Sequence, residues 1–255
     1  MPGAGADAGL KLSWRRRRRQ TPPAARPGGI SIIVPVIDEE RRIGQRLKEL
    51  RGTPDVAEVI VVDGGSRDRT LEIVRGCPGV RLLAALRGRG VQMNAGARAA
   101  SGDVLLFLHA DVSLPPDATA CVARALAAPE VVAGAFRTWT VDDAGRSCLT
   151  PLLHLADLRS RVARLPYGDQ AVFVRREAFV RVGGFPDQPL MEDLELARRL
   201  RRIGRIVVVP AVVRVSGRRF LAHPLSAILT MRLFPLLYRL GVSARVLDRL
   251  YGRPR

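Results

Sequence analysis

Three short segments of the sequence place carboxylates where they could bind and activate a polar ligand. In the first, Asp63 follows the apolar run Val59–Val62 and precedes Gly64 and Gly65. Such glycines let the backbone approach a flat ligand closely, while the carboxylate accepts hydrogen bonds from a base or a ribose. A plain glycine turn, with Asp68 capping the next helix, explains the same residues equally well.

The second segment ends an apolar, strand-like run with His109 and Asp111. Because side chains alternate along a strand, these two residues project from the same face as Phe107. A carboxylate here suits Mg²⁺ or Mn²⁺ bridging a diphosphate, which would stabilise the charge of a leaving phosphate. The alternative is a turn-capping Asp111 beside a packed His109.

The third segment carries Glu192, Asp193 and Glu195 ahead of Leu196 and Leu200. If the segment is helical, the two leucines lie on its buried stripe, Asp193 lies on that same stripe, and Glu192 and Glu195 fall off it. A partly desolvated carboxylate at a helix start can serve as a general base. An acid of the first turn that is favoured only by the helix dipole is the alternative.

Two arginine-containing segments are candidate phosphate clamps. Arg87 and Arg89 alternate with glycines ahead of a helical pattern that contains Gln92, and Arg218 and Arg219 follow a Ser-Gly pair. The first is a fair phosphate-binding arrangement, but it matches the GxGxxG pattern only weakly and follows the wrong strand for a dinucleotide site. For the second, a solvated loop is the alternative.

The elements that would position these residues alternate between short β-branched runs and helical patterns from residue 30 onward. We expect strands at 30–34, 59–62, 80–85 and 104–108. We expect helices at 41–50 and 91–100, and a short helix that follows the glycine turn and ends at Val74. Further along, we expect a strand near 131–141, a helix at 151–164 and a strand at 171–174. This order predicts an α/β fold whose functional residues gather at the carboxyl ends of the strands.

Composition and charge narrow the class of protein. The 255 residues are 47% apolar and 26% charged, which excludes a wholly disordered or multi-span membrane chain. The net charge of +18 predicts an anionic partner. Aromatic residues make up only 5%, so platforms that stack nucleic-acid bases are poorly supported. Three cysteines without metal spacing indicate a reducing, cytoplasmic location.

The chain divides into three expected parts. Residues 1–29 form a basic, disordered tail with seven cationic side chains and one acidic side chain, 30–219 form one domain, and 220–255 form a C-terminal helical segment. The apolar segment Phe220–Tyr238 is interrupted by Arg232 and two prolines, so it is too short to span a bilayer. An interfacial helix on a membrane surface remains an alternative for it.

In order along the chain, these segments resemble the family 2 glycosyltransferases of GT-A fold. The resemblance rests on Ser31–Pro35 with Glu39, on Asp63–Thr70, on His109-Ala110-Asp111, and on Gly183-Gly184-Phe185 followed by Glu192-Asp193. Segments 87–94, 108–111, 168–170 and 189–193 are similar to the bacterial subfamily named radical-SAM/selenodomain-associated transferase 2, some relatives of which are named as carotenoid-acid glycosyltransferases.

The resemblance implies a GT-A domain with a mostly parallel, Rossmann-like sheet flanked by helices. It implies an inverting transfer of a sugar from a nucleotide-diphosphate sugar to a hydroxyl or carboxyl acceptor, with Asp193 as catalytic base and Mg²⁺ or Mn²⁺ on Asp111 and His109. The implied donor-binding residues are Pro35, Glu39, Asp63, Arg87, Gln92, Asp111 and Arg218. The implied acceptor-side residues are Gly184, Asp169 and Glu192.

The same resemblance implies the partners. They are a nucleotide-sugar donor, an acceptor for which lipids and carotenoids are candidates, and the inner membrane face as a peripheral contact. Two residues depart from the family pattern. Asp38 stands where the family commonly has Asn, and His109 replaces the first acid of the metal-binding Asp-x-Asp.

Two alternatives stay open. A nucleotidyltransferase of related fold should carry a glycine-rich, basic loop after its first strand, but that place holds the acidic Asp38-Glu39-Glu40. A non-catalytic protein that binds nucleic acid is supported only by the net charge.

Overall fold

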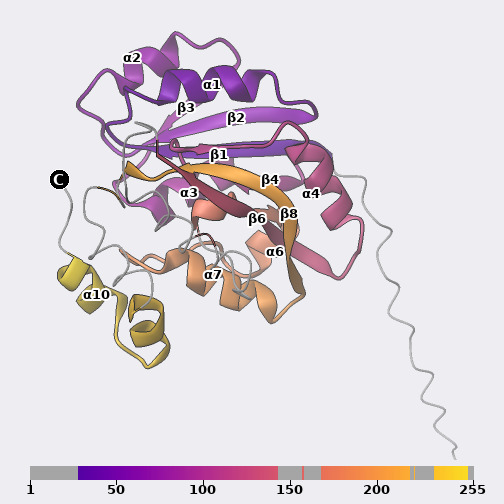
Figure 1. Ribbon diagram of the computed structural model, residues 1–255, viewed down its shortest axis with the longest axis vertical. Helices are drawn as coiled ribbons and strands as arrows, with labels where there is room; N and C mark the ends of the chain where they lie inside the picture. The colour runs from indigo at the N-terminus through magenta and orange to yellow at the C-terminus, as the bar shows by residue number, and fades with distance from the viewer. Residues whose placement is uncertain (1–27, 143–156, 158–167, 219–220, 222–232, 252–255) are drawn as a thin grey trace, which may run out of the picture.

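The computed structural model describes residues 28–142, 157, 168–218, 221 and 233–251. They build an eight-stranded sheet in the order β3-β2-β1-β4-β7-β6-β8-β5. Helices cover both faces of this sheet (Figure 1). One layer of core side chains includes α1, α2 and α4, and the other includes α3, α6 and α7. The predicted α/β class is confirmed.

The first half of the chain alternates strand and helix as the sequence indicates. Its elements are β1 (Ile30–Val36), α1 (Ile43–Arg51), β2 (Val56–Asp63), α2 (Thr70–Arg75), β3 (Val80–Ala84), α3 (Arg89–Ala99) and β4 (Val104–Phe107). The strands β3, β2, β1 and β4 pair side by side and in parallel. Their carboxyl ends therefore lie along one edge of the sheet.

The second half is a mixed sheet. Its elements are β5 (Val112–Ser113), α4 (Ala118–Leu126), β6 (Val131–Val141), η1 (Gly168–Gln170), β7 (Phe173–Arg175), α6 (Arg176–Arg181), α7 (Glu192–Arg201), β8 (Arg205–Ser216) and α10 (Ala244–Tyr251). β7 runs antiparallel to β4 and to β6, whereas β6 and β8 are parallel. The expected helix at 151–164 lies outside the described residues except for Asp157.

The long strand β8 was not expected from the sequence, because Pro210 interrupts its apolar pattern. Proline has no backbone N–H to give to a ladder and is normally kept to edges and bulges. Here the register with β6 shifts between Phe136, which pairs with Val209, and Arg137, which pairs with Val212. The strand thus passes Pro210 through an irregularity and then continues. Helix α4 was also missed.

The central strand β1 is buried at every position, as parallel strands covered on both faces are. Helix α3 packs closely on it at Gly96, where a Cβ atom would lie 2.4 Å from a methyl group of Ile33. The strand also continues through Pro35 to Val36, so the prediction that Pro35 ends it was wrong.

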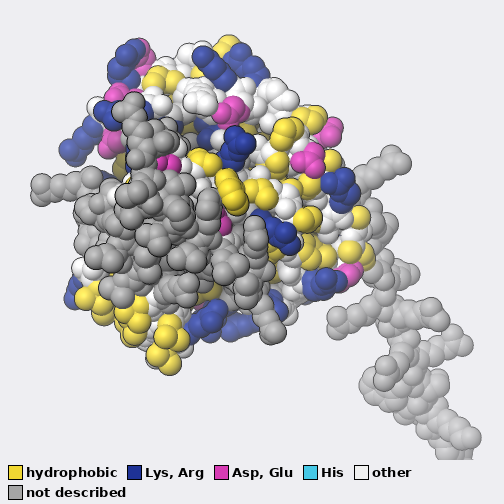
Figure 2. All heavy atoms as spheres, viewed as in Figure 1, with side chains coloured by type: hydrophobic (Ala, Val, Ile, Leu, Met, Phe, Trp, Pro, Cys, Tyr) yellow, Lys and Arg dark blue, Asp and Glu magenta, His cyan; other side chains and the backbone are white. Residues whose placement is uncertain are grey.

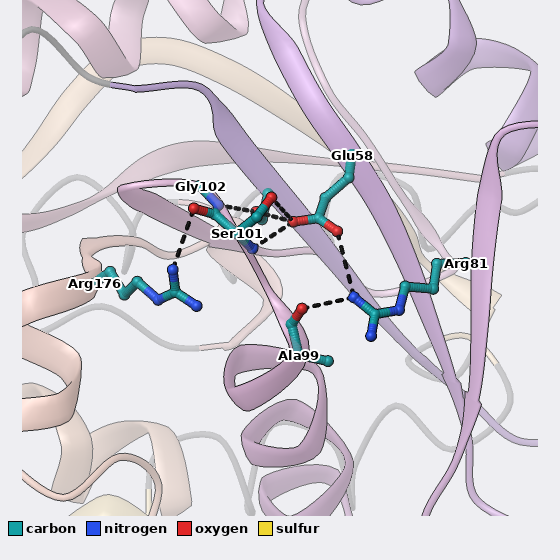
Figure 3. A network of polar contacts seen from close by, with 7 residues as sticks. Glu58, Arg81, Ala99, Ser101, Gly102 and Arg176 are labelled. Carbon is teal, nitrogen blue, oxygen red and sulfur yellow. Dashed lines mark hydrogen bonds and ion pairs between the residues drawn. The ribbon is translucent and has the colours of Figure 1, made fainter.

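The edge of the sheet remote from the strand carboxyl ends is held by a polar network around Glu58 (Figure 3). One Glu58 carboxylate oxygen accepts hydrogen bonds from Ser31 Oγ at 2.8 Å and from Ser101 N and Oγ at 2.6 Å. Arg81 lies 3.9 Å from the other oxygen, and Arg176 donates to the Ser101 carbonyl at 3.1 Å. Burial acts to raise the pKa of Glu58, but the hydrogen bonds and Arg81 outweigh it and lower that pKa.

At the C-terminal end, residues 233–239 are helical and precede α10. Phe234 and Leu247 from these two helices bury Leu190 in a small separate core. Among the described residues, no helix combines the length and the apolar character needed to cross a bilayer. Most of the segment Phe220–Tyr238 lies outside the described residues.

Candidate active site

The glycine turn at the end of β2 is shaped by Asp63 itself. The Asp63 side chain is buried, and its Oδ2 accepts hydrogen bonds from Gly65 N at 2.8 Å and from Ser66 N at 3.1 Å. The hydroxyl of Ser66 donates to the other oxygen. Asp63 therefore fixes the conformation of this turn, and its contact with a nucleotide donor stays a prediction.

The loop after β1 is joined to this turn through Asp38. Its backbone N–H donates to Ser66 Oγ at 3.0 Å, and its Oδ1 accepts from Arg67 N at 2.7 Å. Asp38 has a φ of 52°, a conformation that Asn and Asp adopt more readily than other side chains. An Asn side chain oxygen could accept the same bond from Arg67, so the departure at position 38 conserves the geometry of the loop.

Asp68 makes a second connection between the two loops. Its carboxylate accepts from Glu40 N at 3.0 Å and from Thr70 N at 2.9 Å. Asp68 thus binds the start of α2, as the alternative interpretation expected, although the helix begins after Arg69 rather than directly after Asp68.

Gln92 lies underneath these loops. It is buried, and its Nε2 donates to the carbonyls of Val36 and Val62, at 2.8 Å each. Val36 is the last residue of β1 and Val62 is the last but one of β2, so Gln92 on α3 holds the two strand ends together. Its predicted contact with the nucleotide sugar is untested, as is that of Pro35, which is buried within β1.

Glu39 and Arg218 are far apart in the sequence but lie side by side at the edge of the sheet where the parallel strands end. Arg218 follows β8, and its guanidinium lies 3.8 Å from Oε1 of Glu39. The Glu39 backbone is fixed by a 2.8 Å hydrogen bond to Thr70 Oγ1. The structure therefore brings together two residues that the sequence predicted separately for the donor. Arg219 lies outside the described residues.

His109 and Asp111 follow β4, where the predicted metal site begins. Both side chains are half-buried, and the Asp111 carbonyl accepts a 3.1 Å hydrogen bond from Ser216 N. One carboxylate and one imidazole suit a divalent ion only as part of a set that diphosphate oxygens complete. Among the described residues no group of three or more His, Cys, Asp or Glu side chains is placed to hold a metal by itself.

Sequence reasoning missed Arg46, which supports this turn from α1. The Arg46 side chain is buried, donates to the Ala110 carbonyl at 3.3 Å and to Ser113 Oγ at 2.7 Å, and pairs with Glu49. Burial lowers the pKa of the Arg46 guanidinium, while Glu49 and Asp111 act to raise it. The turn that carries Asp111 is thus held on its inner side by a cation. An arginine on the inner stripe of a helix, beside Leu47, was the available signal.

The two arginines of the predicted phosphate-binding segment, Arg87 and Arg89, have different environments. Arg87 is exposed and forms no ion pair with any residue that the structure describes, which leaves it available to an anion. Arg89, by contrast, has its Nε 3.0 Å from Oε1 of Glu192. It therefore connects the first turn of α3 to the first turn of α7.

The two acids at the start of α7 are arranged differently from the prediction. Glu192, expected off the buried stripe, is 1% exposed, whereas Asp193, expected to be the inward acid, is half-buried. The reason is that α3 packs against the first turn of α7 and covers the Glu192 side. Asp193 still lines a small apolar pocket with Met93, Phe107 and Leu196. Phe107 is the last residue of β4 and lies four residues before Asp111, so the pocket borders the end of this strand.

Burial and the neighbouring Asp193 raise the pKa of Glu192 to about 8, although Arg89 acts to lower it. The side chain of Arg89 is nearly half exposed, so solvent screens its charge and burial outweighs it. Burial at this position therefore favours the protonated form of Glu192.

The segment predicted to lie on the acceptor side is held by Asn94, whose role sequence reasoning did not identify. Asn94 Nδ2 donates to the Phe185 carbonyl at 2.9 Å, and its Oδ1 accepts from Phe185 N at 3.0 Å. Gly184, with a φ of 69°, fits against Asn94 and Phe179, where a Cβ would lie 2.6 Å from Asn94 Oδ1. Asp169, the third predicted acceptor-side residue, lies on η1 between β6 and β7.

The sequence model of the family described as glycosyl transferase family 2 matches residues 31–183, more than half of the chain. The chain belongs to glycosyltransferase family 2. The match spans the glycine turn, the Asp111 segment and Gly183. This membership decides against the nucleotidyltransferase and nucleic-acid-binding alternatives.

Named relatives of this glycosyltransferase domain are longer than it is. An undecaprenyl-phosphate 4-deoxy-4-formamido-L-arabinose transferase of Pseudomonas paraeruginosa is 30% identical over 151 residues, which are 54% of this chain and 44% of that protein. The probable glycosyltransferase YdaM of Bacillus subtilis is 25% identical over 225 residues, 78% of this chain and 52% of that protein. The chain spans about half the length of these curated relatives.

Solved structures agree on the fold. The mannosyltransferase PcManGT of Pyrobaculum calidifontis, in complex with GDP-Man and Mn²⁺, matches with a TM-score of 0.61 at 22% identity, over 89% of this chain and 70% of that one. S. aureus TarS 1–349 matches with a TM-score of 0.57 at 17% identity, over 88% and 69% of the two chains. The GT-A architecture expected from the sequence is confirmed.

Proposed function

We propose that this family 2 domain is an inverting transferase that moves a sugar from a nucleoside-diphosphate sugar to a lipid-linked acceptor. The observation that carries the proposal is the arrangement at the end of β4. Asp111 lies four residues beyond the end of this strand, and Asp193 from α7 lines a small pocket together with Phe107, the last residue of the strand. A diphosphate held at Asp111 and an acceptor held near Asp193 would then both approach a sugar bound outside this end of the sheet.

The donor would bind across the carboxyl edge of β2, β1 and β4. In this proposal Asp63 and Glu39 face the nucleoside, while Arg87 and Arg218 neutralise the diphosphate. Pro35 and Gln92 contribute the shape of the strand ends beneath it. The PcManGT structure, which was solved in complex with GDP-Man, supports a nucleotide-sugar donor.

Asp111 and His109 would hold Mg²⁺ or Mn²⁺ together with the donor diphosphate. When bound, such an ion would stabilise the negative charge that develops on the leaving diphosphate. The structure of PcManGT was solved with Mn²⁺. Arg46 and Ser216 hydrogen-bond to the backbone of this turn at Ala110 and Asp111, which fixes the backbone that carries the Asp111 side chain.

Asp193 would take the proton of an acceptor hydroxyl as the acceptor oxygen attacks the anomeric carbon. Inversion requires that the acceptor attacks from the face of the sugar opposite the diphosphate. The two carboxylates of inverting glycosidases are separated for the same reason, because they act on opposite faces of the sugar. Glu192, Gly184 and Asp169 would line the acceptor side. Because its pKa is raised, Glu192 is the weaker candidate for the base and can support Asp193 from the side.

The acceptor class is supported by the relatives, several of which are named undecaprenyl-phosphate transferases. Such a name indicates a phosphate nucleophile on a lipid. The second pKa of a phosphate monoester is about 6, so at pH 7 it has little proton left to lose. A carboxyl acceptor is likewise ionised at pH 7. A strong dependence of transfer on Asp193 would therefore indicate a hydroxyl acceptor, and a weak dependence would indicate a phosphate or carboxyl acceptor. A lipid acceptor would place the domain at the inner membrane face.

A thermal-shift panel of nucleotide sugars with and without Mn²⁺ tests the proposal, because a ligand of the native state raises its apparent stability. We expect at least one nucleotide sugar to raise the melting temperature, and more so with Mn²⁺. Asp111→Asn should remove the Mn²⁺-dependent part, whereas Asp117→Asn, at an exposed acid further along the chain, should not. No response to any nucleotide sugar or nucleoside diphosphate would contradict the proposed function.

A further inference from the structure

The C-terminal helices expose an unusual number of large apolar side chains. Of the described residues, those with large, exposed apolar side chains in this region are Leu233, Leu236, Leu240, Val246 and Leu250. Leu240 is 73% exposed and Leu250 is 66% exposed. Figure 2 shows hydrophobic side chains gathered over the corner that the C-terminal helices occupy in Figure 1. Apolar side chains gathered in this way mark an interaction surface.

Arginines accompany the apolar side chains on α10. Ala244 and Leu247 are buried and define the inner face of this helix. Val246 and Leu250 are one turn apart and exposed, and Arg245 and Arg249 form a second exposed row beside them. The outward surface of α10 therefore carries an apolar row next to a cationic row.

The preceding helix repeats this pattern. Phe234 is buried, whereas Leu236, Arg239 and Leu240 are exposed on the other side. Arg239, Arg245 and Arg249 form no ion pair within the part of the chain that the structure describes. Within residues 233–251 the acid is Asp248, and it is half-buried. We call the five exposed apolar residues together with these three arginines the leucine–arginine face.

The leucine–arginine face is attached to the segment that leads to Asp193. Phe234 and Leu247 pack on Leu190, and Met191 borders the same cluster. The Tyr238 hydroxyl donates to Gln188 Oε1 at 3.4 Å. The residues that bury these helices thus come from the four positions immediately before α7, which places the face beside the acceptor end of the site.

We propose that the leucine–arginine face binds the surface of an anionic lipid bilayer and thereby holds the acceptor end of the site at the membrane. Leucines of this kind enter the boundary between headgroups and acyl chains, and the flanking arginines pair with lipid phosphates. Charge complementarity selects this occupant, since residues 233–251 have three exposed arginines on this face and no exposed acid. The inference rests on the proposed function in that it names the surface from which a lipid acceptor would come.

Co-sedimentation of the full chain with vesicles tests this inference. The vesicles are equimolar phosphatidylglycerol and phosphatidylcholine in one arm and phosphatidylcholine alone in the other. We expect at least tenfold tighter binding to the anionic vesicles. Replacing Leu236, Leu240 and Leu250 by Ser, or Arg239, Arg245 and Arg249 by Gln, should each weaken that binding at least tenfold.

Two further variants identify the origin of the binding. Val180→Ser with Val212→Ser removes exposed apolar side chains elsewhere and should leave binding unchanged. Changing Arg15–Arg19 to Gln removes the cationic run near the start of the chain and should leave the dependence on the leucines intact. Circular dichroism melting of each variant shows whether it is folded.

The inference is overturned if the leucine variant binds anionic vesicles as tightly as the unchanged chain, or if only the Arg15–Arg19 variant loses binding. It is also overturned if sedimentation velocity shows a dimer that depends on the leucines while vesicles are not bound. The nucleotide-sugar thermal shift separates the two proposals. A shift without vesicle binding contradicts only the membrane surface, and vesicle binding without a shift contradicts only the transferase function.

Discussion

Arg89 and Glu192 join the first turns of α3 and α7, with Nε of the arginine 3.0 Å from Oε1 of the glutamate. Arg87 lies two residues before Arg89, and Asp193 directly follows Glu192. The contact therefore links the loop proposed for the donor diphosphate to the proposed base.

Asp193→Asn should lower sugar transfer to a hydroxyl acceptor by roughly 10²–10⁴-fold, because the amide cannot accept the proton. Binding of the nucleotide sugar should stay within a few-fold, since Asp193 belongs to the proposed acceptor side and not to the proposed donor site. Release of nucleoside diphosphate, followed with the donor that the thermal-shift panel identifies, measures the first quantity, and the shift itself measures the second. Glu195→Gln on the same helix is the control. Transfer to a hydroxyl at a near-normal rate would show that Asp193 is not the base.

Glu192→Gln should change how stability depends on pH. The folded chain keeps the Glu192 proton up to about pH 8, whereas the ordinary pKa is 4.5. Between these values the folded state binds more protons than the unfolded state, so this group makes stability fall as the pH rises through that window. Glutamine has no such proton.

Melting temperatures of the two proteins between pH 4.5 and pH 8.5 measure this effect. The melting temperature of the variant minus that of the unchanged chain should increase as the pH rises, and should level off above about pH 8. Two curves that run parallel over the whole range would mean that Glu192 is ionised in the folded chain.

Arg46→Met should destabilise the fold by about 1–3 kcal/mol, because the Ala110 carbonyl and Ser113 Oγ lose a buried donor. Lys48→Met, two residues further on the exposed side of α1, should change stability by less than about 0.5 kcal/mol. Urea unfolding compares the two variants. The Mn²⁺-dependent thermal shift should also weaken in the Arg46 variant, since the turn that carries Asp111 loses its support. Equal stability of both variants would contradict this role of Arg46.

Gly184→Ala and Gly183→Ala form a matched pair of substitutions. Both glycines have positive φ values, 79° for Gly183 and 69° for Gly184, so an alanine at either site costs about 1–2 kcal/mol of backbone strain. A Cβ at Gly183 meets nothing within 4 Å, whereas one at Gly184 meets the Asn94 and Phe179 side chains. Crowding should add about 1–3 kcal/mol at Gly184 alone. Urea unfolding of both variants checks the difference, and equal losses would contradict the contact with Asn94.

Local patterns in the sequence determined the first half of the fold and the order of its acidic motifs. β1 to β4 and the helices between them follow from apolar runs of strand length and from helical spacing, which depend on neighbours along the chain. Because parallel strands end at a common edge, the positions of Glu39, Asp63 and Asp111 after those strands could also be predicted. The family resemblance then followed from the order of the motifs.

Tertiary structure alone decided the contacts between distant segments. Pro210 hid β8 from a local pattern, because only the pairing with β6 shows that the strand continues past it. The inward acid of α7 was wrongly predicted, because a downstream leucine stripe cannot reveal that α3 covers Glu192. Arg46 under the Ala110 turn, Asn94 on Phe185 and Arg218 beside Glu39 likewise join residues that no periodicity relates. Side-chain burial and polar pairing depend on which elements pack together, and that is set by the whole chain rather than by any window of it.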